Sequence, residues 1–405
     1  MKILLFSTLY PNAAQPHHGI FVENRLRHLL DTTGWEARVV APVPWFPAAA
    51  SRLGPGYAAF AQVPAAERRH GIEVLHPRYP VIPKVGMTVA PGLLYAAARG
   101  SVKRLLRDGY DFDLIDAHYF YPDGVAAAML AAELGKPFVV TGRGTDLNLI
   151  PRYRLPRAQI AWAAERAEGL ITVCDALADD LAALGVDRAR VSVLRNGVDL
   201  TTFTPDPRGR ERLRGELEVS GPVVLSVGHL IERKGHDLAI RAIAGMPEAS
   251  LLIVGSGPEE AALKRLTHEL GMEERVRFVG SVPHETLKNY YSAADILILG
   301  SSREGWPNVL LESMACGTPV VATAVNGSPE VVRDPVAGQV VSERSPEALA
   351  RGLAAVLADL PERAAVRRYA EDFSWDATSR GQQALFTRIL ANGGAPAASA
   401  PSRAY

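Results

Sequence analysis

The sequence predicts an α/β protein made of two Rossmann-like halves, each a mostly parallel sheet covered by helices. Short apolar runs rich in Val, Ile and Leu alternate with longer helical patterns, which is typical of βα units. This alternation restarts after a stretch rich in Pro, Gly and charge at residues 196–222. The 405 residues are 48% hydrophobic, enough for two or three domains. We therefore expect domains at 1–200 and 201–372 that face each other across a cleft.

The expected strands follow in order along both halves. The first half contains KILLF, EARVVA, IEVL, LIDAH, PFVVT, GLITV and RVSVL, and the second contains PVVLSVG, SLLIVG, RVRFVG, DILILG and PVVAT. A last helix is expected at 373–391, followed by a small, polar tail at 392–405 that we expect to be flexible. Because parallel sheets bind ligands beyond the carboxyl ends of their strands, the strand-to-helix loops should carry the function.

Composition excludes several classes of protein. Lys plus Arg and Asp plus Glu both total 44, so no overall positive field favours nucleic acid. Only two cysteines are present, which favours a reducing compartment and a cytoplasmic location. No apolar run approaches the roughly 18–20 residues that a membrane-spanning helix needs.

The strongest motif is SSREGWPNVLLESMACGTPVVAT at residues 301–323. Glu304 precedes a helix expected to begin near Pro307, and Glu312 lies within it. Backbone N–H groups from Gly305 to Val309 would be first-turn donors, which suit a diphosphate. The alternative is that Glu304 only favours a helix N-terminus and that Glu312 is a solvated helix residue.

Two further loops of the second half fit phosphate chemistry. Arg233 and Lys234 follow the strand in LSVGHLIERKGHDLAI, where cations would neutralise phosphate charge; a solvated surface turn is the alternative. Gly255 and Gly257 follow the next strand, and a loop of this kind lets the backbone approach a ligand. A G-x-G pair by itself identifies no ligand.

In the first half, polar residues also follow strand ends. His118 ends LIDAH, Arg143 and Asp146 follow PFVVT, and His18 and Gly19 lie in the loop after the first strand. A strand-end histidine with a purely structural role is the alternative reading of His118. The neighbouring pair at 17–18 is poorly spaced for chelation, and the D-x-D at 111–113 precedes its strand, so no metal site is expected.

The 301–323 string resembles the signature of retaining glycosyltransferases of family 4, whose E-x₇-E pair matches Glu304 and Glu312. The resemblance spans nearly the whole chain and is strongest between 222 and 333. It implies the GT-B arrangement, with the last helix crossing back to the first domain. It also implies transfer of a hexose from a UDP- or GDP-sugar with retention and without a metal or other cofactor. The loop after the first strand looks like those of bacterial surface-polysaccharide enzymes, so the acceptor would be a glycan or a lipid-linked molecule.

Roles carried over from the family fall into three groups. The resemblance implies that the residues at the reaction centre are His118, Lys234, Arg233 and Glu304. It implies that the donor is bound by Gly19, Gly228, His229, Gly255, Gly257, Val279, Val282, Gly305, Trp306, Pro307, Asn308, Val309 and Glu312. It implies that the cleft and the acceptor side are lined by His18, Arg143, Asp146 and Asn196. The chain departs from the family pattern at His229, where Arg is usual, and at Arg143, where His is common.

Other possibilities remain open at this stage. The basic stretch 93–109 and the aromatic loop 42–60 suit peripheral contact with an anionic membrane at the inner face of the cell membrane; a solvated helix face fits equally well. A nucleotide-sugar 2-epimerase and a non-catalytic protein that binds sugar nucleotides are the alternative functions on the same fold.

Overall fold

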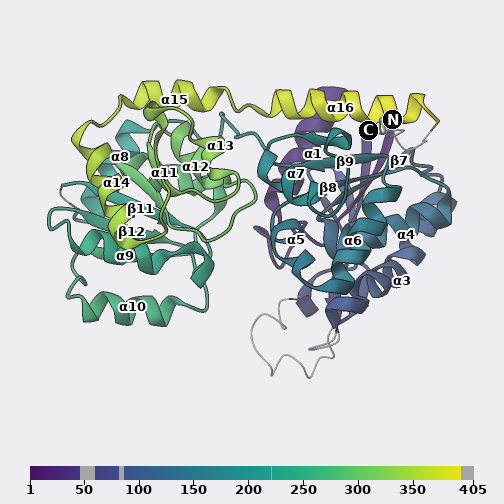
Figure 1. The fold of residues 1–405 in the computed structure, drawn as a ribbon, viewed down its shortest axis with the longest axis horizontal. Helices are drawn as coiled ribbons and strands as arrows, with labels where there is room; N and C mark the ends of the chain where they lie inside the picture. The colour runs from purple at the N-terminus through teal and green to yellow at the C-terminus, as the bar shows by residue number, and fades with distance from the viewer. Residues whose placement is uncertain (46–59, 82–85, 220, 394–405) are drawn as a thin grey trace, which may run out of the picture. The chain divides into compact units, whose positions relative to one another are not determined.

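A computed structural model describes residues 1–45, 60–81, 86–219 and 221–393, and it divides into two compact units (Figure 1). The first unit holds Met1–Arg195 and the C-terminal segment from Asp376, and the second holds Asn196–Trp375. The predicted α/β class with two Rossmann-like halves is confirmed. Most of the aromatic loop expected at 42–60, and the tail from residue 394, lie outside the described residues.

The first unit is built on an eight-stranded sheet in the order β10-β9-β8-β7-β1-β2-β5-β4, in which only β4 and β5 pair antiparallel. A separate two-stranded sheet joins β3 and β6. The strands are β1 (Lys2–Phe6), β2 (Glu36–Val40), β3 (Val43–Trp45), β4 (Ala66–Arg69), β5 (Ile72–Leu75), β6 (Arg78–Pro80), β7 (Leu114–His118), β8 (Phe138–Gly142), β9 (Gly169–Thr172) and β10 (Val191–Val193). The helices are α1 (Ile20–Thr33), α3 (Gly86–Arg107), α4 (Val125–Leu134), α5 (Thr145–Asn148), α6 (Arg154–Arg166), α7 (Asp175–Ala182) and α16 (Trp375–Ala391).

The second unit has a six-stranded parallel sheet in the order β13-β12-β11-β14-β15-β16. The strands are β11 (Val223–Val227), β12 (Ser250–Val254), β13 (Val276–Gly280), β14 (Ile296–Leu299), β15 (Val320–Thr323) and β16 (Gly338–Val341). The helices are α8 (Pro207–Glu216), α9 (His236–Ala244), α10 (Glu260–Glu269), α11 (Leu287–Ala293), α12 (Asn308–Ala315), α13 (Ser328–Val331), α14 (Pro346–Ala358) and α15 (Arg363–Glu371).

Both sheets reverse direction of growth at one point. In the second unit the order runs outward from β11 on one side and from β14 on the other, and in the first unit β1 and β7 play these parts. Ligands of open α/β sheets bind beyond the carboxyl ends of the strands at such a switch point. The fold therefore directs attention to the loops after β1 and β7, and to those after β11 and β14.

Helix α16 packs on the sheet of the first unit. Leu385, Phe386 and Ile389 are buried in one cluster with apolar residues of β1, β8 and β9, and the Phe386 ring stacks on Trp35 at 6.3 Å. These apolar side chains hold the helix on the first unit. The helix begins at Trp375, which belongs to the second unit, so the start of α16 is one of the two points where the chain passes between the units, the other being Arg195–Asn196.

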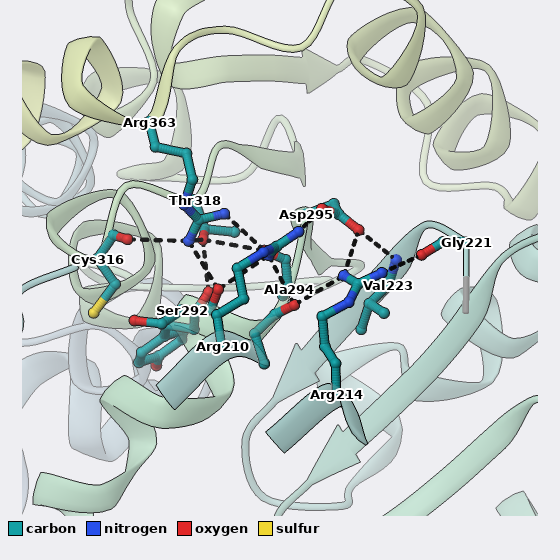
Figure 2. A network of polar contacts seen from close by, with 12 residues as sticks. Arg210, Arg214, Gly221, Val223, Ser292, Ala294, Asp295, Cys316, Thr318 and Arg363 are labelled. Carbon is teal, nitrogen blue, oxygen red and sulfur yellow. Dashed lines mark hydrogen bonds and ion pairs between the residues drawn. The ribbon is translucent and has the colours of Figure 1, made fainter. Parts of the chain in front are cut away.

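An arginine cluster braces the chain between α11 and β14 (Figure 2). Arg210 donates to the carbonyl oxygens of residues 292–294, and Arg363 donates to those of Ser292 and Ala294. Asp295 accepts from Arg210 and, at 3.0 Å, from Arg214. These cations satisfy carbonyl groups at the carboxyl end of α11 that the helix itself leaves without partners. The brace fixes the start of β14, whose far end leads into the Glu304 loop.

The sequence missed four short strands, β3, β4, β6 and β16. Each has three or four residues, and β4 (AERR) and β6 (RYP) contain few apolar side chains. Edge strands of this kind are recruited by a neighbouring strand and carry little signal of their own.

Candidate functional site

The second unit brings two oppositely charged loops together at its switch point. Lys234 lies after β11 and Glu304 after β14, and the Lys234 Nζ atom is 2.6 Å from Glu304 Oε1. Arg233 adds a second cation, with Nη1 3.6 Å from Glu304 Oε2 and a hydrogen bond to the carbonyl of Arg303. The side chains of Lys234 and Arg233 are 15% and 28% exposed, so both are only partly buried.

Glu304 is held as a carboxylate. Its side chain is 8% exposed, and Ser301 Oγ donates to Oε1 at 2.7 Å. Burial works to raise the pKa of Glu304, but Lys234, Arg233 and Ser301 outweigh it and lower the pKa below its usual value. The site therefore consists of the buried Glu304 carboxylate and two neighbouring cations, Lys234 and Arg233, that could also bind a ligand oxygen.

Glu312 lies inside α12, and both of its carboxylate oxygens accept hydrogen bonds. His284 Nε2 lies 3.0 Å from Oε1, and the Tyr291 hydroxyl donates to Oε2 at 2.8 Å. Phe203 packs edge-on against both rings. Burial lowers and Glu312 raises the pKa of His284, and the net effect is a raised pKa. The carboxylate is thus oriented by two ring donors.

The glycines after β11 and β12 serve close packing of neighbouring loops. A Cβ on Gly255, at φ +142°, would come 1.9 Å from the Gly228 carbonyl oxygen, and one on Gly257 would come 2.4 Å from that of Leu230. The Leu230 N–H donates to Ser256 O at 3.0 Å, which locks the loops together. His229 is exposed beside this contact. Val279, within β13, and Val282, two residues after that strand, are half-buried.

Helix α12 begins at Asn308, one residue later than expected, with Pro307 as its N-cap. The Asn308 N–H donates to the Trp306 carbonyl at 3.0 Å, and the Leu310 N–H donates to that of Pro307 at 3.0 Å. Within the stretch from Gly305 to Val309, which the sequence led us to expect as phosphate donors, the Asn308 amide therefore has a local partner.

Asn196 lies at the start of α12. Its side-chain amide donates to Asn308 Oδ1 at 3.3 Å, and both residues belong to the second unit. Next to it, the Val198 N–H donates to the Phe373 carbonyl at 2.9 Å. Trp306 is 6% exposed, with its ring 6.3 Å from that of Phe373. The Asn-Gly-Val string at 196–198 thus joins the beginning of the second unit to Asn308 and to Phe373 near its end.

The first unit also gathers polar residues at its switch point. The Ser7 hydroxyl, after β1, donates to the His118 carbonyl at the end of β7 at 2.9 Å. His118 is 1% exposed, with Nε2 3.2 Å from Asp116 Oδ2 and Nδ1 2.5 Å from Arg143 Nη2. The carboxyl ends of β1, β7 and β8 are joined in this way.

Asp146 and Asp123 shape the surrounding loops through backbone contacts. Asp146 accepts from the N–H groups of Phe120 and Gly144, both at 2.7 Å, and burial raises its pKa. Asp123 accepts from the Thr8 N–H and hydroxyl, and burial raises its pKa to about 7. Both side chains therefore hold neighbouring loops together through hydrogen bonds from backbone N–H groups.

His18 and Gly19 have comparable roles in the loop after β1. His18 Nε2 lies 3.0 Å from the Thr8 carbonyl, and burial lowers the pKa of the imidazole. Gly19 caps α1 at φ +67°, where a Cβ would come 2.4 Å from the Leu9 carbonyl. No side chain fits there, so a glycine is required for this loop to return to α1.

Comparisons with known proteins agree with this geometry. The family model for glycosyl transferases group 1 matches residues 209–373, and that for glycosyltransferase family 4 matches residues 19–202. The chain is 31% identical to the putative teichuronic acid biosynthesis glycosyltransferase TuaC of Bacillus subtilis over 334 residues, 81% of this chain and 82% of that one. The chain belongs to glycosyltransferase family 4.

Other family 4 relatives and solved structures extend the match. A D-inositol 3-phosphate glycosyltransferase of Xylanimonas cellulosilytica is 34% identical over 78% of this chain and 82% of its own length. Sucrose-phosphate synthase from Thermosynechococcus elongatus has a TM-score of 0.77 at 23% identity, covering 96% of this chain and 99% of that one. HepE from Anabaena, solved with UDP and glucose, has a TM-score of 0.73 at 21% identity, covering 96% and 100%. The expected GT-B fold is thereby confirmed.

Within this family 4 chain, the sequence identified the charged residues but missed their partners. Ser301, His284 and Tyr291 in the second unit, and Asp116 in the first, orient the residues that were singled out. Only Asp116 left a sequence signal, because it lies two positions before His118 and so on the same face of β7.

Two further observations concern metals and membranes. Among the described residues, no group of three or more His, Cys, Asp or Glu side chains is arranged to hold a metal ion. No helix in the described ranges is long and apolar enough to cross a membrane.

Proposed function

We propose that this glycosyltransferase moves a hexose from a nucleotide-diphosphate sugar, a UDP- or GDP-sugar, to its acceptor with retention of configuration and without a metal. The observation that carries the proposal is the contact of Lys234 and Arg233 with Glu304 at the switch point of the second unit. HepE, a structural neighbour, was solved with UDP-glucose, which supports a nucleotide-sugar donor.

The chemistry follows from where the charges lie. When the bond from the anomeric carbon to the diphosphate oxygen breaks, negative charge develops on the departing nucleotide diphosphate. Lys234 and Arg233 are partly exposed cations that stabilise this charge, an electrostatic contribution that is often the largest in catalysis. Glu304 holds the cations in place and accepts hydrogen bonds from sugar hydroxyls. The acceptor oxygen then bonds to the same face of the sugar, and its proton passes to the leaving diphosphate.

Glu312 suits recognition of the ribose. A carboxylate accepts from two vicinal hydroxyls, as at dinucleotide sites. His284 and Tyr291 fix its orientation through hydrogen bonds at 3.0 and 2.8 Å. Ribose binding would replace or share these contacts.

For the acceptor we propose a glycan or lipid-linked molecule of bacterial polysaccharide or glycoconjugate synthesis. Support comes from the relative TuaC, which is described as a putative teichuronic acid biosynthesis glycosyltransferase.

We also propose a cytoplasmic protein that contacts an anionic membrane peripherally through α3. Arg104 and Arg107 are exposed there, whereas Arg99 and Lys103 both contact Glu133, which offsets part of the positive charge. Flotation with phosphatidylglycerol vesicles, compared between wild type and Arg104→Gln/Arg107→Gln, tests the membrane contact.

The first experiment measures thermal stability against UDP, GDP, ADP and their sugar conjugates. A ligand at about 100 times its Kd adds roughly 2.7 kcal/mol, so one base family should raise the Tm clearly. The Lys234→Ala variant should lose this shift, whereas Lys264→Ala, which removes an exposed lysine of α10, should keep it. No shift with any nucleotide in the wild type contradicts the proposed donor class.

The second experiment determines stereochemistry and metal dependence with the donor so identified. The product anomer, read by NMR, should match that of the donor sugar, and excess EDTA should leave the rate unchanged. An inverted product or a rate abolished by EDTA and restored by a divalent cation contradicts the proposed mechanism.

A further inference from the structure

Arg363, the first residue of α15, joins the carboxyl ends of α11 and α12 (Figure 2). Its Nη1 atom donates to the Ala294 carbonyl at 2.9 Å, and Nη2 donates to that of Ser292 at 3.0 Å. Nη2 also donates to the carbonyl of Cys316, the C-cap of α12, at 3.1 Å. The end of a helix leaves carbonyl groups without partners, and a planar guanidinium can serve several of them at once. One side chain therefore bridges two helix ends.

The same guanidinium reaches the backbone of Tyr291 through the hydroxyl of Thr318. Arg363 Nη2 donates to Thr318 Oγ1 at 2.7 Å, and that hydroxyl donates to the Tyr291 carbonyl at 2.6 Å. Tyr291 and Thr318 are fully buried. Between Cys316 and Thr318, a Cβ on Gly317, at φ +79°, would come 2.9 Å from the Arg363 carbonyl oxygen. The turn that ends α12 therefore packs directly on the start of α15.

The alignment of α11 and α12 decides how Glu312 is held. The Tyr291 hydroxyl, on α11, donates to Glu312 Oε2 at 2.8 Å. His284, which lies just before α11, has Nε2 3.0 Å from Glu312 Oε1. Because Glu312 belongs to α12, both contacts cross from the first helix to the second. They depend on the relative placement of these two helices, which Arg363 joins at their carboxyl ends.

Glu312 keeps acceptor capacity for a ligand in this arrangement. An ionised carboxylate has about four lone-pair sites, half of them on each oxygen. His284 and Tyr291 use one site on each oxygen. One further site on each oxygen matches the two vicinal hydroxyls of a ribose. A carboxylate turned by the loss of one ring contact would no longer offer one site to each hydroxyl.

We propose that Arg363 is a positioning residue for ribose recognition: by joining α11 to α12 it holds the Tyr291 hydroxyl on Glu312 and so fixes the plane of that carboxylate. The inference rests on the proposed function for the ribose role of Glu312. Arg363 should therefore contribute to the preference for a ribonucleotide over its 2′-deoxy form, although its side chain bonds to the ends of two helices and not to Glu312.

Arg210 supplies a matched control. It donates to the carbonyls of Ser292 and Ala294, as Arg363 does, and to Asp295. Within the described part of the chain, it makes no hydrogen bond to α12 or to the turn after it. Arg210→Met therefore weakens the end of α11 and leaves the bridge to α12 in place, whereas Arg363→Met removes the bridge. A purely structural role predicts similar behaviour of the two variants, and a positioning role predicts a difference.

The first test needs no ligand and follows the His284 ring by NMR in the full chain, with its signals assigned by their loss in His284→Asn. Burial lowers the pKa of His284, but Glu312 raises it more, so this pKa reports how closely Glu312 is held. Arg363→Met should lower the pKa, and Arg210→Met should leave it unchanged. An unchanged pKa in folded Arg363→Met, or an equal fall in Arg210→Met, overturns the inference.

The second test measures Kd by calorimetry for UDP, GDP and their 2′-deoxy forms. The wild type should prefer the ribonucleotide roughly 10-fold or more, on the scale of one hydrogen bond to a charged group. Arg363→Met and Tyr291→Phe should each lose most of this preference, and Arg210→Met should keep it. The double variant should lose no more than either single one, because Arg363 acts through Tyr291. A preference kept in Arg363→Met, or losses that add in the double variant, overturns the positioning role.

Glu312→Gln separates this inference from the proposed function. If the wild type shows no ribose preference, or if Glu312→Gln keeps it, the proposed ribose role is wrong and the inference falls with it. If Glu312→Gln loses the preference and Arg363→Met keeps it, the proposed function stands and the positioning role alone is wrong. If the wild type binds no nucleotide, the proposed function fails, and the His284 titration still decides whether Arg363 holds Glu312.

A second variant covers the case in which Arg363→Met does not fold. Thr318→Val removes only the hydroxyl that links Arg363 to the Tyr291 carbonyl. It should lower the pKa of His284 and reduce the ribose preference in the same direction, to a smaller extent. If both stay at their wild-type values in folded Thr318→Val, the link through Tyr291 is overturned.

Discussion

The two units place polar and charged residues at the same topological position, but they differ in how far they bury them. In the second unit, Lys234 and Arg233 reach Glu304 from a loop, and their side chains remain 15% and 28% exposed. In the first unit, His118 and its partner Asp116 lie on a strand and are 1% exposed. The sheet topology thus fixes where a site forms, while the exposure of each side chain decides whether its charge can act on a ligand or orders the protein.

This difference has an energetic side. Charges that stay near solvent keep part of their hydration and can exchange a protein partner for a ligand at low cost. Charges buried in the first unit have lost that hydration, so each needs its full set of hydrogen bonds. Removing a member of the first cluster should therefore affect stability, and removing a member of the second should affect activity.

The largest effect is expected for Lys234→Ala. The variant loses the cation closest to Glu304 and should lower kcat/KM by about 100-fold or more, on the scale of one preorganised electrostatic contact. Because Lys234 also lowers the pKa of the buried Glu304 carboxylate, the unfolding free energy should fall as well, and the rates are compared for folded protein. Initial rates of sugar transfer, with Lys264→Ala as the control, measure this effect. Near-normal sugar transfer by folded Lys234→Ala would show that the partly exposed cations of the second unit do not act on the ligand.

An intermediate effect is expected for Arg25→Met in the first unit. The change leaves Gln382 Oε1 and the Leu194 carbonyl without their buried donor, which should cost about 2–3 kcal/mol of unfolding free energy. Burial already lowers the pKa of Arg25 to about 10, a sign of how costly this charge is to hold. Urea unfolding measures the cost, and Arg27→Met on the same helix serves as the half-buried control. Equal losses of unfolding free energy in the two variants would show that the hydrogen bonds of Arg25 to Gln382 and to the Leu194 carbonyl add no special stability.

The smallest effect is expected for His284→Asn, which tests pH dependence. The folded pKa of His284 is raised above the unfolded value of about 6.5, so its contact with Glu312 stabilises fully below pH 6.5. This contribution is lost as the pH rises through the folded pKa. Urea unfolding should show wild type ahead of the variant by about 1 kcal/mol or less at pH 5.5, narrowing at pH 8.5.

His118 should show the opposite sign. Its folded pKa of about 4 lies below the unfolded value, so the unfolded chain binds more protons between pH 4 and about 6.5. Its contribution to stability therefore falls as the pH drops through that window, and is constant above it. If the difference in unfolding free energy between wild type and His284→Asn grew toward pH 8.5, the stabilising contact of protonated His284 with Glu312 would be contradicted.

Sequence reasoning found the α/β halves, because buried parallel strands read as continuous apolar runs between helical patterns. It also singled out Glu304, Lys234 and His118, since each follows or ends such a run, and Glu312 through the E-x₇-E pair. It placed the start of the helix after Glu304 within one residue, and the structure adds that the Asn308 amide there has a local partner.

The contacts among these residues depend on tertiary structure. Lys234 and Glu304 are 70 positions apart, and Asp116 and Gln382 are 266 apart. They meet because β11 pairs with β14 in the second sheet, and because α16 returns to the sheet that contains β7. Local sequence records which side chains end a strand, whereas strand order and helix packing, which are set by burial over the whole chain, decide which of them touch.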